Sequence, residues 1–388
     1  KFGFGGMMEM KKTKVRTLIK QIRGVSYKPE DLHNELDDNS VILLRANNID
    51  EGKINFDDVV YVDKSKVSDE QYLKVGDVLI CASSGSKNLV GKAASIRFNM
   101  KCTFGAFCKV IRPKNGFCEY LGVYFQSPVY RRKISEVAIG ANINNIRNEH
   151  IDELDIPVFS NDEQVNVVKK MNLIQEIILN RKAELEKLDN LIKARFVEMF
   201  GDPVHSDKYG TRKLSSCVAE KADMVDGPFG SQVNTKIDYI ENGEIPVIRT
   251  VNVKMMSFSP VDLKYMTRKK YETVIRSQVL PGDVILTKVG TIGNVCVFPD
   301  TYKEAVLSTT GSCRIRVDNS IVNTEFFAYN LLYLKSKLLE IASAGVQPFL
   351  NMNHVKNIDI LNVPLGKQTE FADFVHRVDK SKVVEIIN

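Results

Sequence analysis

The sequence predicts an α+β protein in which two homologous mixed α/β domains are separated by long coiled-coil helices. Three observations support this prediction. Short apolar segments bounded by glycine and asparagine recur after roughly 205 residues, a heptad pattern fills the connector between the two copies, and a similar helical pattern follows the second copy. A repeat of this length indicates a duplicated domain with its connector and excludes a solenoid.

Composition sets the broad class of the protein. With 388 residues, of which 44% are hydrophobic, the chain can bury a full core and form two domains. Its net charge of +6 favours a polyanionic partner without proving one. The seven cysteines contain no Cys-x-x-Cys pair, which argues against a disulfide framework and a zinc site. No apolar run or signal-peptide pattern indicates membrane contact, so we expect a cytoplasmic protein with reduced thiols.

The repeat divides the chain into five segments. Residues 1–10 precede the fold as a remnant or N-terminal tail, residues 11–157 form the first domain, and residues 158–202 form the central spacer helix. The second domain covers residues 203–364, and residues 365–388 form a distal helix that is short or truncated. Similar phrases mark the two domains, among them Val75-Gly76-Asp77-Val78 in the first and Pro281-Gly282-Asp283-Val284 in the second.

Each copy continues in the same order. A glycine-bearing loop follows the Gly-Asp-Val phrase, at residues 83–92 in the first copy and 288–294 in the second. Asn-rich segments come next, at residues 142–146 and 350–353, and each copy then exits through Pro157 or Pro364 into a helical pattern. The loops differ more between the copies than the predicted strands do.

The central helix shows a coiled-coil pattern, although ordinary helix packing stays an alternative. At about 1.5 Å per residue it would be a rod of roughly 60 Å, stopped at Gly201-Asp202-Pro203. An antiparallel partner helix would relate the two domains by an approximate two-fold axis, which suits duplex DNA as a ligand. The predicted helix-packing residues are Met171, Ile174, Ile178, Leu185, Leu188, Ile192, Met199, Phe371, Val375 and Val378.

From about Lys12 to the end, this order of features closely resembles the specificity subunits of type I restriction-modification enzymes. The resemblance rests on Arg23-Gly24-Val25-Ser26-Tyr27, Ser83-Ser84-Gly85-Ser86 and Val289-Gly290-Thr291-Ile292-Gly293 in their order and repetition. It implies two target-recognition domains, each reading half of a bipartite double-stranded DNA site. It also implies that the helices fix the unread gap and dock methyltransferase subunits, and through them the restriction/translocase subunit.

The resemblance implies a recognition subunit without catalytic residues, metal or cofactor of its own. S-adenosylmethionine, ATP and Mg are then expected on the partner subunits. The chain has neither an Asn-Pro-Pro-aromatic or Asp-Pro-Pro-aromatic methyltransferase signature nor a Gly-x-x-x-x-Gly-Lys-Ser/Thr nucleotide loop. Its five histidines show no metal-ligand spacing.

Polar residues at strand ends and in the loops are the candidates for DNA contact. Arg and Asn offer bidentate pairings with guanine and adenine, and glycine lets backbone N–H groups approach phosphates. Turn capping, tight turns and solvent exposure are the alternative interpretation for each of them. The candidates are Arg45, Asn47, Asn48, Ser84, Ser86, Lys87, Lys92, Asn144 and Asn145 in the first copy, and Arg249, Thr250, Asn252, Lys288, Thr291, Gln347 and Asn351 in the second.

Two rival functions stay open. Asp262-Leu263-Lys264 with Asp238 upstream matches half of a common nuclease pattern, which would predict Mg-dependent cutting by the chain alone. An assembly scaffold that no longer reads DNA would bind its partners without sequence preference. The divergent loops on matching frameworks argue against the scaffold.

Overall fold

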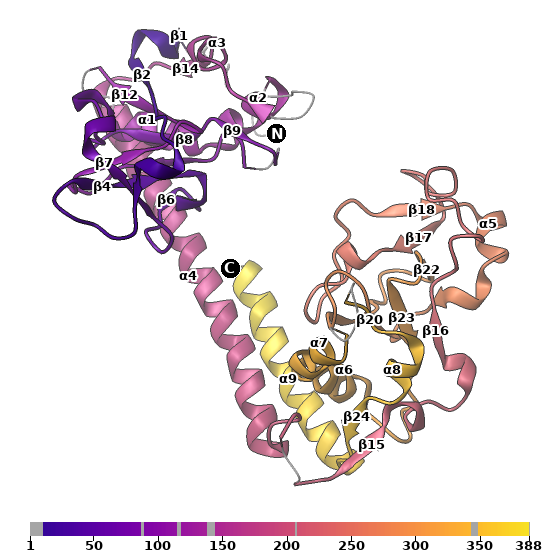
Figure 1. Ribbon diagram of the computed structural model, residues 1–388. Coiled ribbons are helices and arrows are strands. Elements are labelled where there is room, and N and C mark those ends of the chain that lie inside the picture. Colours follow the sequence, from indigo (N-terminus) through magenta and orange to yellow (C-terminus); the bar gives the residue numbers. More distant parts are fainter. Residues whose placement is uncertain are drawn as a thin grey trace. The chain divides into compact units, whose positions relative to one another are not determined.

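The computed structural model describes residues 11–86, 89–114, 118–137, 144–205, 208–342 and 348–387 (Figure 1). The chain divides into two compact units, Lys1–Asn180 and Arg181–Asn388, and the division falls within one long helix. Mixed sheets and helices build both units, as the sequence predicts. None of the described helices combines the length and apolar character needed to cross a membrane.

Two four-stranded sheets form the first unit. The first sheet has the order β10-β8-β12-β2 and is antiparallel throughout, and the second has the order β11-β4-β7-β3 with β11 parallel to β4. The strands of these sheets are β2 (Ile19–Arg23), β3 (Leu32–His33), β4 (Ser40–Leu44), β7 (Val60–Asp63), β8 (Val78–Cys81), β10 (Ala93–Ser95), β11 (Cys102–Phe104) and β12 (Cys108–Pro113). Shorter pairs are β1 (Lys12–Lys14) with β14 (Asp155–Pro157), β5 (Ile49–Asp50) with β6 (Lys53–Ile54), and β9 (Ser83–Ser84) with β13 (Asn144–Asn145).

The second unit repeats the first of these sheets and three strands of the other, but its fourth strand, β19, pairs with β22, whereas β3 of the first unit pairs with β7 at the opposite edge. Its sheets have the orders β21-β20-β23-β16 and β18-β17-β22-β19, and β22 is again parallel to β17. Their strands are β16 (Met224–Asp226), β17 (Ile245–Ile248), β18 (Lys264–Met266), β19 (Gln278–Val279), β20 (Val284–Thr287), β21 (Val295–Val297), β22 (Ala305–Leu307) and β23 (Ser312–Ile315), and β15 (Thr211–Lys213) pairs with β24 (Asp359–Leu361). The internal duplication predicted from the sequence is therefore largely a duplication of topology.

A buried ion pair explains the Gly-Asp-Val phrase of each copy. Asp77 is 1% exposed and accepts from Arg112 Nε at 2.8 Å and Nη2 at 2.7 Å, and its carboxylate also accepts from the Lys74 backbone N–H. In the second unit Asp283 accepts two hydrogen bonds of 2.8 Å from Arg316. Such bidentate pairs fix geometry as well as charge. This pair holds the start of the central strand, β8 or β20, against its neighbour.

Four helices also recur in the same order, α1 to α4 in correspondence with α6 to α9, whereas α5 has no α-helical counterpart among the described residues of the first unit. The helices are α1 (Cys118–Gln126), α2 (Pro128–Val137), α3 (Asn148–Asp152) and α4 (Asn161–Phe200), followed in the second unit by α5 (Arg268–Glu272), α6 (Thr324–Tyr333), α7 (Lys335–Ala342), α8 (Met352–Lys356) and α9 (Leu365–Ile387). Helix α4 begins with a capping box between Ser160 and Glu163 and ends at Gly201, whose φ of 82° suits glycine. The 40-residue length of this helix follows from these two signals and the unbroken run of helix-forming residues between them.

The last turns of α4 pair antiparallel with α9 in the second unit (Figure 1). Arg195 pairs with Glu370 at 3.1 Å, and Asp189 pairs with Lys382 at 2.8 Å. Ile192, Phe371, Val375 and Val378 are buried in one core, and the predicted residues Leu188 and Met199 pack partly buried against it.

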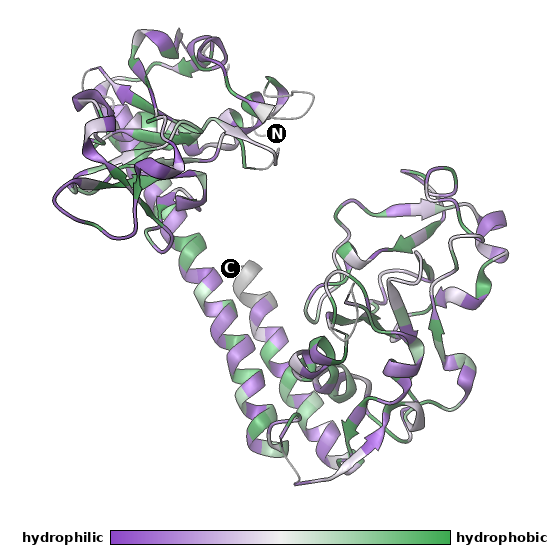
Figure 2. Cartoon of the chain, in the orientation of Figure 1, coloured by the Kyte–Doolittle hydropathy of each residue, from purple (hydrophilic) through white to green (hydrophobic). Residues whose placement is uncertain are grey.

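The earlier part of the predicted seam differs from expectation. Ile174, Ile178 and Leu185 are 47%, 50% and 37% exposed, while Met171 is half-buried. The contacts between α4 and α9 involve the last turns of α4, from Asp189 to Phe200, whereas Ile174 and Ile178 lie earlier, in the part of α4 that belongs to the first unit. Figure 2 shows hydrophobic and hydrophilic residues alternating in bands along α4.

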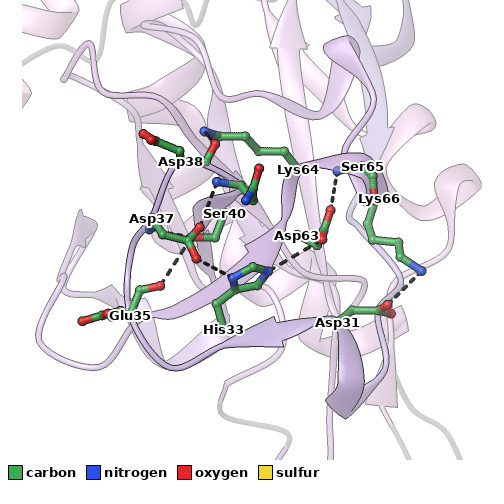
Figure 3. Close-up of polar contacts among 11 residues, drawn as sticks. Asp31, His33, Glu35, Asp37, Asp38, Ser40, Asp63, Lys64, Ser65 and Lys66 are labelled. Atoms are coloured by element: carbon green, nitrogen blue, oxygen red, sulfur yellow. Dashed lines mark hydrogen bonds and ion pairs between the residues drawn. The ribbon is translucent and has the colours of Figure 1, made fainter.

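A histidine between two carboxylates ties the β3–β4 connection to β7 (Figure 3). His33 Nδ1 lies 2.8 Å from Asp37 Oδ2, and Nε2 lies 3.7 Å from Asp63 Oδ2. The hydrogen bond with Asp37 and the charge of both carboxylates raise the pKa of His33. The same contact lowers the pKa of Asp37 to about 2. The charged histidine therefore stabilises this connection.

Removing the buried carboxylate should destabilise the first unit. Asp77→Ala leaves the mostly buried Arg112 guanidinium unpaired, and we expect a loss of about 3 kcal/mol in the free energy of unfolding, measured by urea titration. Glu70→Gln, which removes an exposed ion pair with Lys20, is the control and should cost less than about 1 kcal/mol. Equal effects of the two substitutions would contradict the role given to Asp77.

The stability of the first unit should depend on the protonation of His33. Because the folded-state pKa is raised, its stabilisation is complete below the ordinary pKa of 6.5 and is lost as the pH rises through the higher folded-state value. We expect the Tm of the wild type to fall toward that of His33→Gln as the pH rises above 6.5. His205→Gln, at a side chain 81% exposed, is the control and should leave the profile unchanged. A constant gap between wild type and His33→Gln across this range would refute the linkage.

Candidate nucleic-acid interface

A cleft of about 650 Å³ lies in the first unit where four separate chain segments meet. The segments are the phrase after β2, the turn after β4, the glycine loop at β9 and the connection from β11 to β12. Polar side chains and one exposed aromatic ring line it. The lining residues are Val25, Ser26, Tyr27, Arg45, Ala46, Asn47, Ser83, Ser84, Gly85, Gly105, Ala106, Phe107 and Cys108.

A cleft of about 670 Å³ occupies the corresponding place in the second unit. It combines the turn after β17, the glycine loop after β20 and the connection from β22 to β23. The lining residues are Thr235, Tyr239, Glu241, Ile248, Arg249, Thr250, Val251, Lys264, Val289, Gly290, Ser308, Thr309, Gly311 and Ser312. Each unit therefore has a cleft beside its glycine loop, built largely from equivalent segments.

Backbone contacts bring the predicted glycine loops and Asn-rich segments together. In the first unit, β9 pairs with β13, so that Ser83 faces Asn145. In the second unit, a bridge joins Val289 to Phe349. A Cβ atom at Gly24 would overlap the carbonyl oxygen of Gly105, so glycine allows the segment after β2 to lie directly against the connection from β11 to β12.

The turn after β4 places two of the predicted residues at the cleft. Arg45 Nη2 and Asn47 Nδ2 donate to the Asp58 carboxylate at 3.0 and 2.7 Å, and Asp58 itself is 74% exposed. Asn48 differs, since its side chain is 1% exposed. Its amide accepts from the Arg45 N–H at 2.7 Å and donates to the carbonyl groups of Asn55 and Asp58. Asn48 therefore forms the turn that presents its two neighbours.

The turn after β17 has the same construction. Buried Asn252 accepts from the Arg249 N–H at 3.1 Å and donates to the carbonyl groups of Ser259 and Val261. Arg249 pairs with Asp262 at 2.8 Å, and Lys264 pairs with the same carboxylate at 3.2 Å. The hydrogen bonds from Arg249 and Lys264 lower the pKa of Asp262. Thr250 is half-buried at the lip of the cleft.

The remaining candidates of the first unit lie on or near the glycine loop. Ser86 and Asn145 are exposed, and the hydroxyl of half-buried Ser84 accepts from the Ser86 N–H at 3.1 Å. Lys92 lines a different cavity, of about 430 Å³, that includes Gln175 of α4. Asn144 pairs with Ser84 through its backbone. The prediction for Lys87 lies outside the described residues.

In the second unit, Thr291 is exposed, but two other predicted contacts are engaged within the protein. Lys288 is 3% exposed and its ammonium pairs with Asp226, so it does not reach the surface as a phosphate-binding lysine would. Asn351 caps α8 by accepting from the His354 N–H at 2.8 Å. The prediction for Gln347 lies outside the described residues. DNA contact by any of the predicted residues stays a prediction.

The residues of the nuclease alternative do not gather into one acidic site. Asp262 is held by Arg249 and Lys264, whereas Asp238 pairs with Lys270 at 3.1 Å. Within the described parts of the chain, no group of three or more His, Cys, Asp or Glu side chains is arranged to hold a metal ion.

Sequence reasoning missed the apolar side chains at the clefts. Phe107 is 70% exposed in the first cleft, and Val251 and Val289 are 52% and 44% exposed in the second. Valine and phenylalanine are residue types typical of a core, so the sequence alone does not mark these positions as exposed. Comparison of the two copies position by position would have found them.

Comparison with known proteins shows to which class of protein the chain belongs. Residues 228–388 match the family model described as the type I restriction modification DNA specificity domain. The type I restriction enzyme StySPI specificity subunit of Salmonella potsdam is 30% identical over 386 residues, covering 94% of this chain and 80% of that protein. The EcoKI specificity subunit of Escherichia coli (strain K12) is 31% identical over 280 residues, covering 71% of this chain and 60% of that protein.

The chain therefore belongs to the family of type I restriction enzyme specificity subunits. Among solved structures, the type I S subunit from M. genitalium has a TM-score of 0.49 at 15% identity, covering 98% of this chain and 92% of that chain. The HsdS subunit from Thermoanaerobacter tengcongensis has a TM-score of 0.37 at 15% identity, covering 97% and 91%.

Substitution of the two asparagines of the first turn should distinguish a structural role, expected for Asn48, from a role in DNA recognition, expected for Asn47. Asn48→Ala removes three hydrogen bonds of a buried amide, and we expect a loss of about 2 kcal/mol in stability, measured by thermal denaturation. Asn47→Ala should leave stability within about 0.5 kcal/mol, because its side chain is exposed, and should weaken DNA binding. An Asn47→Ala chain that binds DNA as the wild type does would exclude Asn47 from recognition.

Proposed function

We propose that this chain reads a bipartite sequence in double-stranded DNA, with one cleft for each half-site. The observation that carries the proposal is the pair of equivalent clefts, each with an arginine at its lip, in a member of the specificity-subunit family. Phosphate contacts would position each unit, and side chains at the lip would read base edges in the groove.

Arg45 and Arg249 are the foremost candidates for direct contact. Each holds its guanidinium on an aspartate that is itself largely exposed, Asp58 or Asp262. Exposed ion pairs contribute little to stability, so a guanine edge or a phosphate can replace the aspartate at small cost. Asn48 and Asn252 would act by holding these arginines in place.

Helix α4 would make the gap between half-sites part of the recognised sequence. It is continuous for 40 residues, and a continuous helix is a stiff connector. Binding of one half-site would raise the effective concentration of the other cleft only where the separation matches.

The exposed turns of α4 would dock methyltransferase subunits. Leu173, Ile174, Ile177 and Ile178 are each about half exposed on neighbouring turns, which is costly in water unless a partner covers them. The restriction/translocase subunit would join through the methyltransferase subunits. In this proposal the chain is not an enzyme, and S-adenosylmethionine, ATP and Mg bind to those partners.

Co-expression with the methyltransferase subunit encoded beside it, followed by methylation mapping on a random DNA library, tests the proposal. We expect methylated adenines confined to a split motif with a fixed gap. Ile178→Glu should abolish both the complex and methylation, whereas Val129→Glu, at an exposed position on α2, is the matched control and should preserve both. A complex without sequence preference would favour the scaffold, and Mg-dependent cutting by the chain alone would favour the nuclease.

A further inference from the structure

Backbone hydrogen bonds align the two clefts residue by residue. The N–H groups of Ala82 and Ser83 both donate to the Phe107 carbonyl, and those of Lys288 and Val289 both donate to the Gly311 carbonyl. Ser83 is therefore equivalent to Val289, and Phe107 to Gly311. Matching bridges then make Asn145 equivalent to Phe349.

Two further equivalences follow in the same way. In each turn the backbone N–H of the arginine donates to the side chain of the buried asparagine, so Arg45 is equivalent to Arg249. Two residues further along the chain, Asn47 is equivalent to Val251. Gly24 lies against the carbonyl oxygen of Gly105 in the connection from β11 to β12, and Gly227 lies against that of Thr309 in the connection from β22 to β23. Two residues later, exposed Ser26 corresponds to exposed Phe229.

The lips of the two clefts have opposite chemistry at these four positions. The first unit presents Ser26, Asn47, Ser83 and Asn145, all of which carry hydrogen-bonding groups. The second unit presents Phe229, Val251, Val289 and Phe349, which are 59%, 52%, 44% and 49% exposed. At a fifth position the difference is reversed, because the first unit has the apolar side chain of Phe107 where the second unit has Gly311.

Burial in the core does not account for the apolar set, since all four side chains are about half exposed. Val251 and Val289 line the second cleft together with Arg249 and Thr250. Phe349 is joined to Val289 by a backbone bridge, and Phe229 follows Gly227, which lies against Thr309 of the cleft lining. Exposed apolar residues gathered around one cleft are typical of a binding surface. An apolar lip on a DNA-reading frame has one base feature to contact in the major groove, the C5-methyl group of thymine.

We propose that the second unit reads its half-site mainly through thymine methyl groups, and that the first unit reads its half-site mainly through hydrogen bonds to base edges. The inference rests on the proposed reading of a bipartite site and adds the chemical class of each half. One half-site should therefore contain A·T pairs at the positions that the second cleft covers. The other half-site carries no such requirement beyond the single contact available to Phe107.

Replacing thymine by uracil tests the inference, because uracil keeps every hydrogen-bonding group of the base and lacks only the methyl. The assembled complex with the methyltransferase subunit is titrated with duplexes that carry uracil in one half-site at a time. We expect each contacted methyl in the second unit's half-site to contribute about fourfold in Kd, the factor for one buried methylene-sized group. Uracil in the other half-site should change Kd by about fourfold at most, from the one ring of Phe107.

Reciprocal substitutions assign the half-sites. Val251→Asn should alter base preference in one half of the motif and remove part of its sensitivity to uracil. Asn47→Val, the matched exchange in the first unit, should alter the other half. Thermal denaturation of both variants checks folding.

The outcomes separate the inference from the function on which it rests. A library that yields no split motif overturns the proposed function. A split motif whose two halves tolerate uracil equally, or whose Val251 half contains no thymine, overturns the thymine inference alone. Loss of the complex with the methyltransferase subunit in Val251→Asn, while the variant keeps the wild-type Tm, would instead identify the apolar lip as a protein-binding surface, and this also overturns the inference.

Discussion

A buried carboxylate–guanidinium pair lies at the root of the central strand in each unit. Asp77 with Arg112 and Asp283 with Arg316 anchor the start of β8 and β20, and the glycine loop leaves from the other end of the same strand. Taking one member of such a pair away leaves a charge that the interior cannot solvate, which is why both must be kept together. The loop's position relative to the neighbouring turns depends on this anchor.

In each unit, the residue that forms the turn at the cleft is different from the residues that the turn exposes. Buried Asn48 and Asn252 close identical turns through backbone contacts, so the arginine before each of them is presented in the same way. The residue directly before each asparagine is free to vary, since Asn47 and Val251 take no part in the turn's buried hydrogen bonds. In the proposed function, a fixed frame with free positions would allow one fold to read two half-sites of different chemistry.

Helix α4 contributes differently along its length. Its last turns are packed by Ile192, Phe196 and Phe200 against α9 and the second unit's core, and ion pairs at Asp189 and Arg195 set the register. Its earlier turns carry exposed isoleucines. A single helix thus combines a section packed into the core of the second unit with a section whose apolar side chains are about half exposed.

The sequence by itself determined the duplication, the order of elements and the long helix, because these depend on local patterns: apolar periodicity, capping residues and glycine turns. It also predicted the arginine turns and the glycine loops. Only the tertiary structure decided that Lys288 is buried on Asp226, that Asn48 supports its neighbours, and that half of the heptad seam is exposed. Burial and register depend on contacts between residues far apart in the chain, such as Asn145 with Ser83, and a one-residue change of register would reverse which side chains face the cleft.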